Sequence, residues 1–407
     1  MTHPTASEFL FVEAGTAGRA RPATAESTGG YAIEVSHRLE DALVPWRLLA
    51  RTGAGPVYQS YEWTQHWMNE VGRAEGVRPV IVIGRRGGVP SFLWPMGLRR
   101  QGGVGVVSWL GGKHANYNFG LIAPDAARDV GPAEVRRWFT TVARQTPGAD
   151  LFVLCNQPET WEGVPNPLHR LGGREAASHA YRTSLAGGFE AVLARHNGAK
   201  KRKKLRWQTN ALADVGGFRF IAAEDAATAH AILDAFAAQK SARLQAQGIS
   251  NAFARPGVMG FFHALVEDRF RSGRPLIEVF AVEIAGSIRA TFAGGVHGNR
   301  FSGYFNSIAE DEFARVSPGE LLLYHVIEAC CRRGLDMFDL GLGEARYKAS
   351  WCDGEDRMFE TVLPVSLAGR AVAPVLTART ALKRRLRNNQ SAWGLIKAAR
   401  RRLAPQG

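Results

Sequence analysis

Residues 300–351 read RFSGYFNSIAEDEFARVSPGELLLYHVIEACCRRGLDMFDLGLGEARYKASW, and this stretch decides the fold. Its order is a strand, a loop, a Ser-Pro-Gly turn, a helix over residues 317–333, a short apolar strand over residues 337–340 and a glycine-rich turn. A turn that opens a helix behind a strand offers free backbone N–H groups and a helix dipole to an anion. The stretch therefore predicts a site for a phosphate-bearing cofactor.

The turn before the predicted helix has the residues of a helix start. Ser317 is expected as the N-cap, Pro318 suits the first helical position, and Glu320 is placed to close a capping box. Gly319 would let a ligand approach the backbone closely, and Arg315 would add a positive charge. An ordinary capped helix without a ligand is the alternative interpretation.

A second group of chemically useful side chains follows the strand over residues 337–340. Asp339 lies in that strand, two glycines end it, and Tyr347 and Lys348 come next. A tyrosine can serve as a general acid, and a lysine can stabilise developing negative charge. Alternatively, Tyr347 and Trp351, at i and i+4, simply pack on one helical face.

The positive charge is local. The net charge is +14, and residues 370–407 alone contain ten Lys or Arg and no acid. A second cluster puts six cations into residues 200–206. We therefore interpret charge segment by segment, and not as a sign of general nucleic-acid binding.

Motifs of several other protein classes are missing. The sequence has no P-loop, no G-x-S-x-G elbow, no complete dinucleotide fingerprint and no H-E-x-x-H zinc motif, so we expect no metal site. Its four cysteines form no C-x-x-C pair and are expected to be reduced. We find no signal peptide and no apolar run of about 20 residues, which predicts a cytoplasmic protein.

The chain divides into four predicted parts. Residues 1–30 lack periodicity and are predicted to be a disordered lead. Residues 31–186 and residues 187–366 each contain helices, an antiparallel meander, and then a helix and a strand. In the second half, the meander is expected over residues 276–307, after helices over residues 199–214, 226–246 and 257–272. Residues 367–407 form the basic tail.

Several of these stretches together resemble a known family. They are KKRKKLRW, GYFNSIAEDEFARVSPGELLLYHVIE and RGLDMFDLGLGEARYKASW, with YQSYEWTQHWMNEVG and RPVIVIG in the first half. They are similar to GNAT-type acyltransferases of the CelD-like group, which is associated with cellulose and exopolysaccharide synthesis, and more distantly to FemAB peptidyltransferases. The resemblance covers most of residues 31–365. It implies an α/β (α+β) fold with two tandem GNAT-like domains, each a mixed, largely antiparallel sheet flanked by helices.

The resemblance also implies a donor and a set of site residues. The donor would be acetyl-CoA or another acyl-CoA, and its diphosphate would lie on the turn after the fourth strand. Only one glycine of the family's usual turn pattern remains here. The cofactor-binding residues implied are Asn306, Ser307, Arg315, Val316, Ser317, Pro318 and Gly319. The tyrosine that protonates the leaving thiolate in many GNAT enzymes maps to Tyr347. The catalytic residues predicted are Tyr347, Lys348, Asp339 and His297, with Glu278 as a further candidate base.

The expected acceptor is an amine or hydroxyl on a small molecule or glycan, such as a sugar or cell-envelope precursor. The residues predicted to bind it are His114, Asn116, Tyr304 and Glu344. Two alternatives stay open: a FemAB-like transferase that uses aminoacyl-tRNA, indicated by the basic helix, and a non-catalytic GNAT scaffold that binds a partner. Residues 370–407 have the composition of a helix attracted to an anionic membrane surface, which would place the protein at the periphery of the inner membrane.

Overall fold

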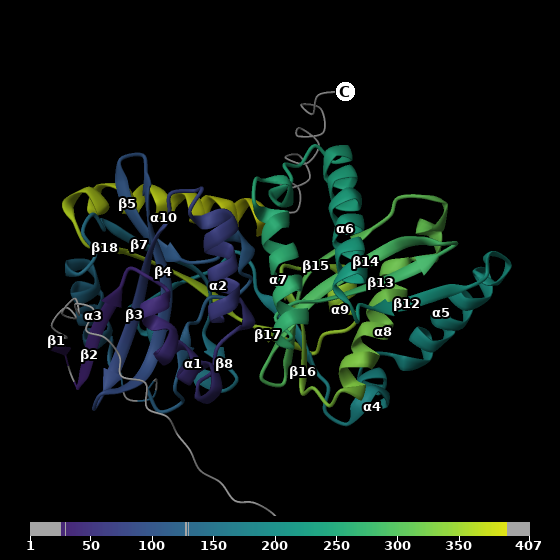
Figure 1. Ribbon diagram of the computed structural model, residues 1–407, viewed down its shortest axis with the longest axis horizontal. Helices are drawn as coiled ribbons and strands as arrows, with labels where there is room; N and C mark the ends of the chain where they lie inside the picture. Colours follow the sequence, from purple (N-terminus) through teal and green to yellow (C-terminus); the bar gives the residue numbers. More distant parts are fainter. Residues whose placement is uncertain (1–25, 29, 127, 129, 389–407) are drawn as a thin grey trace, which may run out of the picture.

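The computed structural model describes residues 26–28, 30–126, 128 and 130–388. Figure 1 shows two sheet-and-helix units side by side, the first half of the chain on the left and most of the second half on the right. Among the described helices, none is long and apolar enough to cross a membrane.

The larger sheet contains nine strands within the described residues. Their order is β1 (Glu26–Thr28), β2 (Tyr31–Ser36), β3 (Arg78–Arg86), β4 (Val89–Gln101), β5 (Val104–Trp109), β7 (Leu151–Pro158), β18 (Met358–Pro364) and β10 (Arg174–Glu175), with β6 (Leu121–Ile122) beside β4. All pairs are antiparallel except β5 with β7. The helices of this half are α1 (Leu43–Thr52), α2 (Tyr61–Trp67) and α3 (Pro132–Arg144).

The second sheet has seven described strands. Their order is β12 (Phe218–Ala222), β13 (Glu278–Ile284), β14 (Ser287–His297), β15 (Arg300–Ile308), β16 (Met337–Leu342), β11 (Ala180–Ser184) and β17 (Gly354–Asp356). A small hairpin, β8 (Thr160–Trp161) with β9 (Val164–Pro165), lies outside both sheets. The helices of this half are α4 (Gly188–Arg195), α5 (Gly198–Ala211), α6 (Ala226–Ala246), α7 (Val258–Ser272), α8 (Pro318–Arg332) and α9 (Arg346–Ala349). α10 (Leu367–Asn388) follows β18 and packs on β18, β5 and β7 of the first sheet.

The predicted fold class, a mixed α/β fold of two tandem units with helix-flanked sheets, is confirmed. The predicted meander is β13–β14–β15, and the predicted helices are α5, α6, α7 and α8 with ends shifted by a few residues at most. Within the lead that we predicted to be disordered, residues 26–28 pair with β2 instead, because their backbone completes an open sheet edge. Residues 1–25 lie outside the described part.

The two sheets exchange strands near the predicted boundary. β11 precedes residue 186, but it pairs with β16 and β17 of the second sheet. β18 precedes residue 366, but it pairs with β7 of the first sheet. The domain boundaries remain a prediction, and the halves are tied together by two crossings of the chain.

The hydrophobic core also continues from one half to the other. One buried cluster extends from the first sheet through α2 and α7 to the second sheet. At the junction, Trp63 contacts Tyr58, Phe261 and Tyr304 edge-on, with ring centroids 5.1–5.6 Å apart. A second cluster lies beneath α4, α5 and α8. Large aromatic rings contribute most to the packing of such cores, and Tyr304 belongs to β15. The first half therefore stabilises β15 by direct packing.

Candidate functional site

β15 and β16 form a wedge, which is the candidate site. The two strands are parallel neighbours over only three residue pairs, the last being Ser302 with Asp339. Beyond that point β15 continues to Ile308 and β16 to Leu342 without pairing with each other. Tyr304 lies at the branch point, because Gly303 and Phe305 pair with adjacent residues of β14 and Tyr304 is left as a bulge. A bulge bends a strand, which is consistent with the separation of β15 from β16.

The backbone carbonyls freed by this separation are satisfied by side chains. On β15, the Gly303 carbonyl accepts from the Tyr58 hydroxyl and from the Asn116 amide, both at 3.2 Å. On the other wall, the buried Lys348 ammonium donates to the carbonyls of Gly341 at 3.0 Å and Leu342 at 2.7 Å. Since buried carbonyls need such partners, these side chains hold the wedge open.

The predicted acid Tyr347 stands at the open end of the wedge. The Asn306 amide, on β15, donates to the Tyr347 hydroxyl at 3.3 Å. Burial raises the pKa of Tyr347, the Asn306 hydrogen bond partly opposes that rise, and Cys352 adds to it. Tyr347 is therefore protonated at neutral pH. Because its oxygen accepts from Asn306, its own hydrogen is free to be donated.

Asp339 does not have the surroundings of a general base. It is fully buried, and one oxygen accepts from the Tyr117 hydroxyl at 2.5 Å and the Gly341 N–H at 2.6 Å. The other oxygen accepts from the Arg300 guanidinium at 2.8 Å. Burial opposes the charge on Arg300, but Asp339, Tyr117 and Asp356 outweigh that effect and hold the pKa of Arg300 above its ordinary value. The structure thus assigns Asp339 to a buried ion pair at the base of the wedge.

The other two candidate bases are not free to act beside Tyr347 either, because His297 is distant along β15 and Glu278 is held in an ion pair. His297 ends β14 and pairs with Arg300, about six residues along β15 from Asn306, which is on the order of 20 Å. Burial lowers the pKa of His297. Glu278 is buried and bound by the Arg333 guanidinium at 2.7 and 2.9 Å.

The predicted acceptor residues are only partly brought together. Asn116 and Tyr304 lie at the branch point, and Glu344 is exposed on the turn that follows β16. His114 is buried in the first half, where burial lowers its pKa to about 4, with Glu75 and Arg255 as charged neighbours.

The predicted diphosphate turn links a short 3₁₀ helix, η8 (Glu312–Val316), to α8. Ser317 is the N-cap residue of α8 and Pro318 begins the helix, as predicted, but Ser317 adopts φ +55° and its side chain makes no capping hydrogen bond. The predicted capping box is wrong, because Glu320 forms an ion pair with Lys204 of α5 instead. Left-handed backbone at Ser317 turns the side chain away from the N–H groups that an N-cap would serve.

The backbone of this turn is fixed from the side of α5. The buried Gln208 amide donates to the carbonyls of Val316 at 2.6 Å and Ser317 at 3.2 Å. Pro318 has no N–H, and the next N–H, that of Gly319, has no acceptor in the described part of the chain. A Cβ on Gly319 would lie 2.6 Å from Cδ1 of Ile308, so a larger residue here would have to displace the end of that side chain.

The turn and the cations near it are suited to bind an anion. The exposed Arg315 precedes the turn, Lys204 of α5 pairs with Glu320 of the first helical turn, and Lys201 of α5 lies over the Trp351 ring within the electrostatic influence of Glu320. Burial lowers the pKa of Lys201 to about 8, with Lys200 and Lys204 lowering it further and Glu320 opposing. A free amide at a helix N-terminus among cations is the usual donor set for a phosphate group. By contrast, Ser307 is buried and its hydroxyl is used by Thr291 and Gln239.

The sequence did not single out Tyr58, Arg300 or Gln208, and it marked Lys201 only as one of the six cations of residues 200–206. Gln208 lies on the apolar stripe of α5 with Leu205 and Leu212, and a polar residue on such a stripe was a detectable signal. No local signal identifies Tyr58, because its partner Gly303 is 245 residues away.

Comparison with known proteins identifies the second half. Residues 199–349 match the model of the acetyltransferase (GNAT) domain family. The chain carries a GNAT-type transferase domain. The predicted enzyme class is thereby confirmed, whereas the CelD-like subgroup is not tested. The wedge, α8 and α9 all lie within or at the edge of the matched residues.

Solved structures share the fold over most of the chain. FemX aligns with a TM-score of 0.56 at 11% identity, covering 81% of this chain and 97% of FemX. A conserved protein of unknown function from Bacteroides thetaiotaomicron gives 0.51 at 11% identity, covering 81% and 99%. The C-terminal domain of a putative lysylphosphatidylglycerol synthetase from Agrobacterium fabrum gives 0.50 at 11% identity, covering 85% and 98%. No curated protein gave a match. At this identity the likeness extends to the fold alone.

Proposed function

We propose that the protein is an acyl-CoA-dependent N- or O-acyltransferase that acts on a sugar or cell-envelope precursor, as in the CelD-like group that its sequence resembles. The single observation that carries the proposal is the open wedge between β15 and β16, with Tyr347 at its mouth. A wedge whose freed carbonyls are already satisfied can receive an extended ligand without first breaking strand pairing.

Each element of the site has one task in this proposal. An acyl-CoA supplies the reactive thioester, and the turn from Arg315 to Gly319 holds its diphosphate with the help of Lys201. Tyr347, whose pKa is raised by burial and which is therefore neutral, donates its hydroxyl proton to the leaving sulfur. Asn306 orients the Tyr347 hydroxyl through the 3.3 Å hydrogen bond. Glu344, exposed beside the wedge, is our candidate to receive the acceptor's proton.

Calorimetry and kinetics test this proposal together. We expect CoA and acetyl-CoA to bind with a saturable heat at ligand concentrations up to about 1 mM, the usual upper range of substrate constants. Tyr347→Phe should lower turnover by about 10²- to 10⁴-fold and leave the affinity for CoA unchanged. Tyr61→Phe, in the first half, serves as the matched control and should have wild-type turnover. Absence of saturable binding to either ligand would refute the acyl-CoA assignment.

A second candidate is a transferase that uses aminoacyl-tRNA as its donor. One feature of the turn favours an aminoacyl-tRNA donor. Among the described residues of the turn, only Gly319 has a free backbone N–H, whereas the GNAT turn pattern predicts several. An electrophoretic shift with aminoacyl-tRNA that persists at about 0.15 M salt, without any CoA binding, would support this candidate over the first.

A further inference from the structure

Helix α5 carries its cations in two rows that differ in their partners. The inner row is neutralised or covered: the contacts are Arg202 with Glu190, Lys204 with Glu320, and Lys201 with the ring of Trp351 at 3.8 Å. These contacts fix α5 against α4, α8 and the segment after α9. They account for half of the six basic residues in the sequence cluster.

The outer row is Lys200, Lys203 and Arg206. All three side chains are exposed, and no acidic partner for any of them occurs within the described residues. Trp207 follows on the same stripe, four residues after Lys203, and is 50% exposed. Val215, in the short 3₁₀ helix after α5, is 42% exposed. We call Lys200, Lys203, Arg206, Trp207 and Val215 the α5 face.

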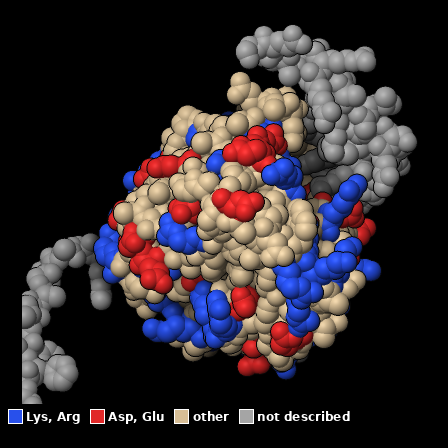
Figure 2. All heavy atoms as spheres, turned by 90° about the vertical axis from the view of Figure 1, so that its right-hand side faces the viewer, with Lys and Arg blue, Asp and Glu red and all other residues tan. Residues whose placement is uncertain are grey.

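The α5 face lies at an extremity of the molecule. Figure 1 shows α5 at the right-hand edge, beyond α8 and β12, and Figure 2, which views that side, shows Lys and Arg side chains gathered there. The three cations span six residues of helix, or about 9 Å. A single helix at an outer edge presents a convex surface. Such a surface is better suited to contact a flat bilayer than to enclose a nucleic-acid strand.

We propose that the α5 face docks the protein on an anionic lipid bilayer. Unpaired cations are attracted to acidic headgroups, and tryptophan is the side chain that prefers the headgroup boundary. The exposed valine in the short helix that follows α5 would gain from contact with acyl chains and offers nothing to a phosphodiester backbone. Two of the three cations are lysines, whereas nucleic-acid recognition favours arginine forks. These features together favour a bilayer over an RNA.

Docking through this face would bring the candidate site to the membrane surface. Gln208 of α5 holds the turn before α8 by its two hydrogen bonds, so the diphosphate turn is adjacent to the docked helix. The acceptor would then be reached at the headgroup level. This inference goes beyond the proposed acyl transfer and does not depend on it, because vesicle binding is measured without a donor or turnover.

Vesicle sedimentation with the full chain tests the inference. We expect binding to vesicles with about 30% phosphatidylglycerol, weak binding to pure phosphatidylcholine, and a decline with salt. Each outer cation should contribute about fivefold, so the triple variant Lys200→Gln, Lys203→Gln, Arg206→Gln should bind about 100-fold more weakly. Brominated lipid should quench the wild type more than Trp207→Phe, because only the wild type inserts this indole.

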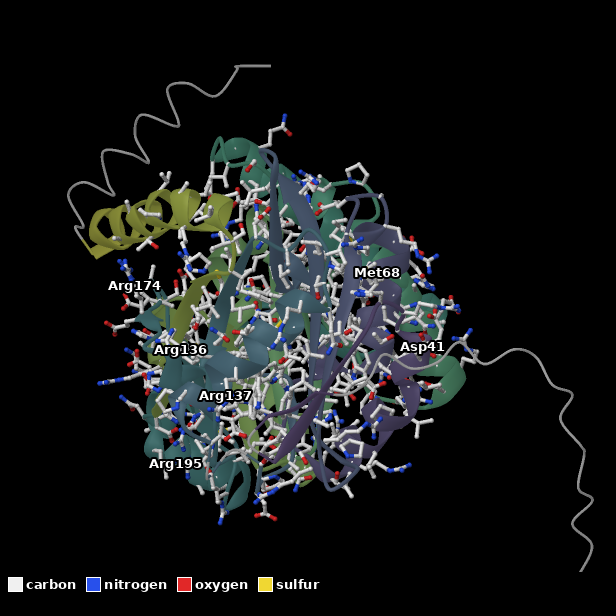
Figure 3. The ribbon with its side chains drawn as sticks, turned by 90° about the vertical axis from the view of Figure 1, so that its left-hand side faces the viewer. Asp41, Met68, Arg136, Arg137, Arg174 and Arg195 are labelled. Atoms are coloured by element: carbon white, nitrogen blue, oxygen red, sulfur yellow. The ribbon has the colours of Figure 1, made fainter. Side chains whose placement is uncertain are left out.

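The control removes three cations from elsewhere. Figure 3 shows Arg136, Arg137 and Arg174 on the side of the molecule opposite α5. Their triple glutamine variant has the same net charge as the α5 variant and should lose much less affinity. Equal losses in both variants, or unchanged vesicle binding in the α5 variant, would overturn the proposal. So would loss of tRNA binding in the α5 variant together with intact vesicle binding, which would assign the face to RNA.

Discussion

The ion pair between Arg300 and Asp339 allows a quantitative test of how the wedge is held. Both side chains are almost inaccessible, at 6% and 0% exposure, and Asp339 also accepts from Tyr117 and Gly341. Asp339→Asn removes the charge but keeps one oxygen for those two donors. It also turns an amide donor toward the Arg300 guanidinium, which retains its ion pair with Asp356.

Removing one partner of a buried pair costs about 3–5 kcal/mol. An unfolding entropy of about 2 cal/mol/K per residue gives roughly 0.8 kcal/mol/K for the 407-residue chain, so Tm should fall by about 4–6 °C. Differential scanning calorimetry of Asp339→Asn measures this shift. The combined variant Arg300→Met, Asp339→Leu should be more stable than the sum of its single changes by about 1–3 kcal/mol, because neither charge is then left unpaired.

Two outcomes would contradict this reasoning. A Tm within about 1 °C of wild type would mean that the pair is not desolvated as its burial indicates. Strict additivity of the two single changes would mean that Arg300 and Asp339 do not interact across the base of the wedge. In the acyltransferase assay, normal Tm with a large loss of turnover would restore Asp339 as a catalytic base.

Two further predictions concern the diphosphate turn. Gly319→Ala should destabilise the protein by about 1 kcal/mol in urea unfolding and weaken CoA binding, because its Cβ would lie 2.6 Å from Ile308 Cδ1. Adding Ile308→Val, which removes Cδ1, should recover most of the lost stability. If this second change recovers nothing, the packing argument is wrong. Burial lowers the pKa of Lys201 to about 8, so its charge is lost as pH rises through that value. CoA affinity should therefore be constant below about pH 7 and fall severalfold between about pH 7 and pH 9. Lys201→Arg should abolish this fall, and an unchanged pH dependence in that variant would exclude Lys201 as a ligand.

The sequence predicted the local elements of the second half well. α6 has the predicted bounds, and the meander over residues 276–307 was predicted from alternation and turn residues. Local chemistry was less reliable at the helix start, where Ser317 and Glu320 have the residue types of a capping box but not its geometry. Tertiary contacts from α5 explain the difference. Glu320 forms an ion pair with Lys204, and Gln208 donates to the carbonyls of the turn.

The least predictable part of the site is the one that the two halves build together. Two glycines were predicted to end the strand that contains Asp339, but the separation of β15 from β16 also requires partners for the freed carbonyls. The partners of the Gly303 carbonyl on β15 are Tyr58 and Asn116 in the other half. Such contacts join residues about 190 or more positions apart and leave no periodic signal. The exchange of β11 and β18 between the sheets has the same origin, because alternation defines a strand but not its neighbour. The first half therefore belongs to the candidate site as a structural wall, and changes at Tyr58 or Asn116 should disturb the wedge even though neither residue lies in the GNAT-type region.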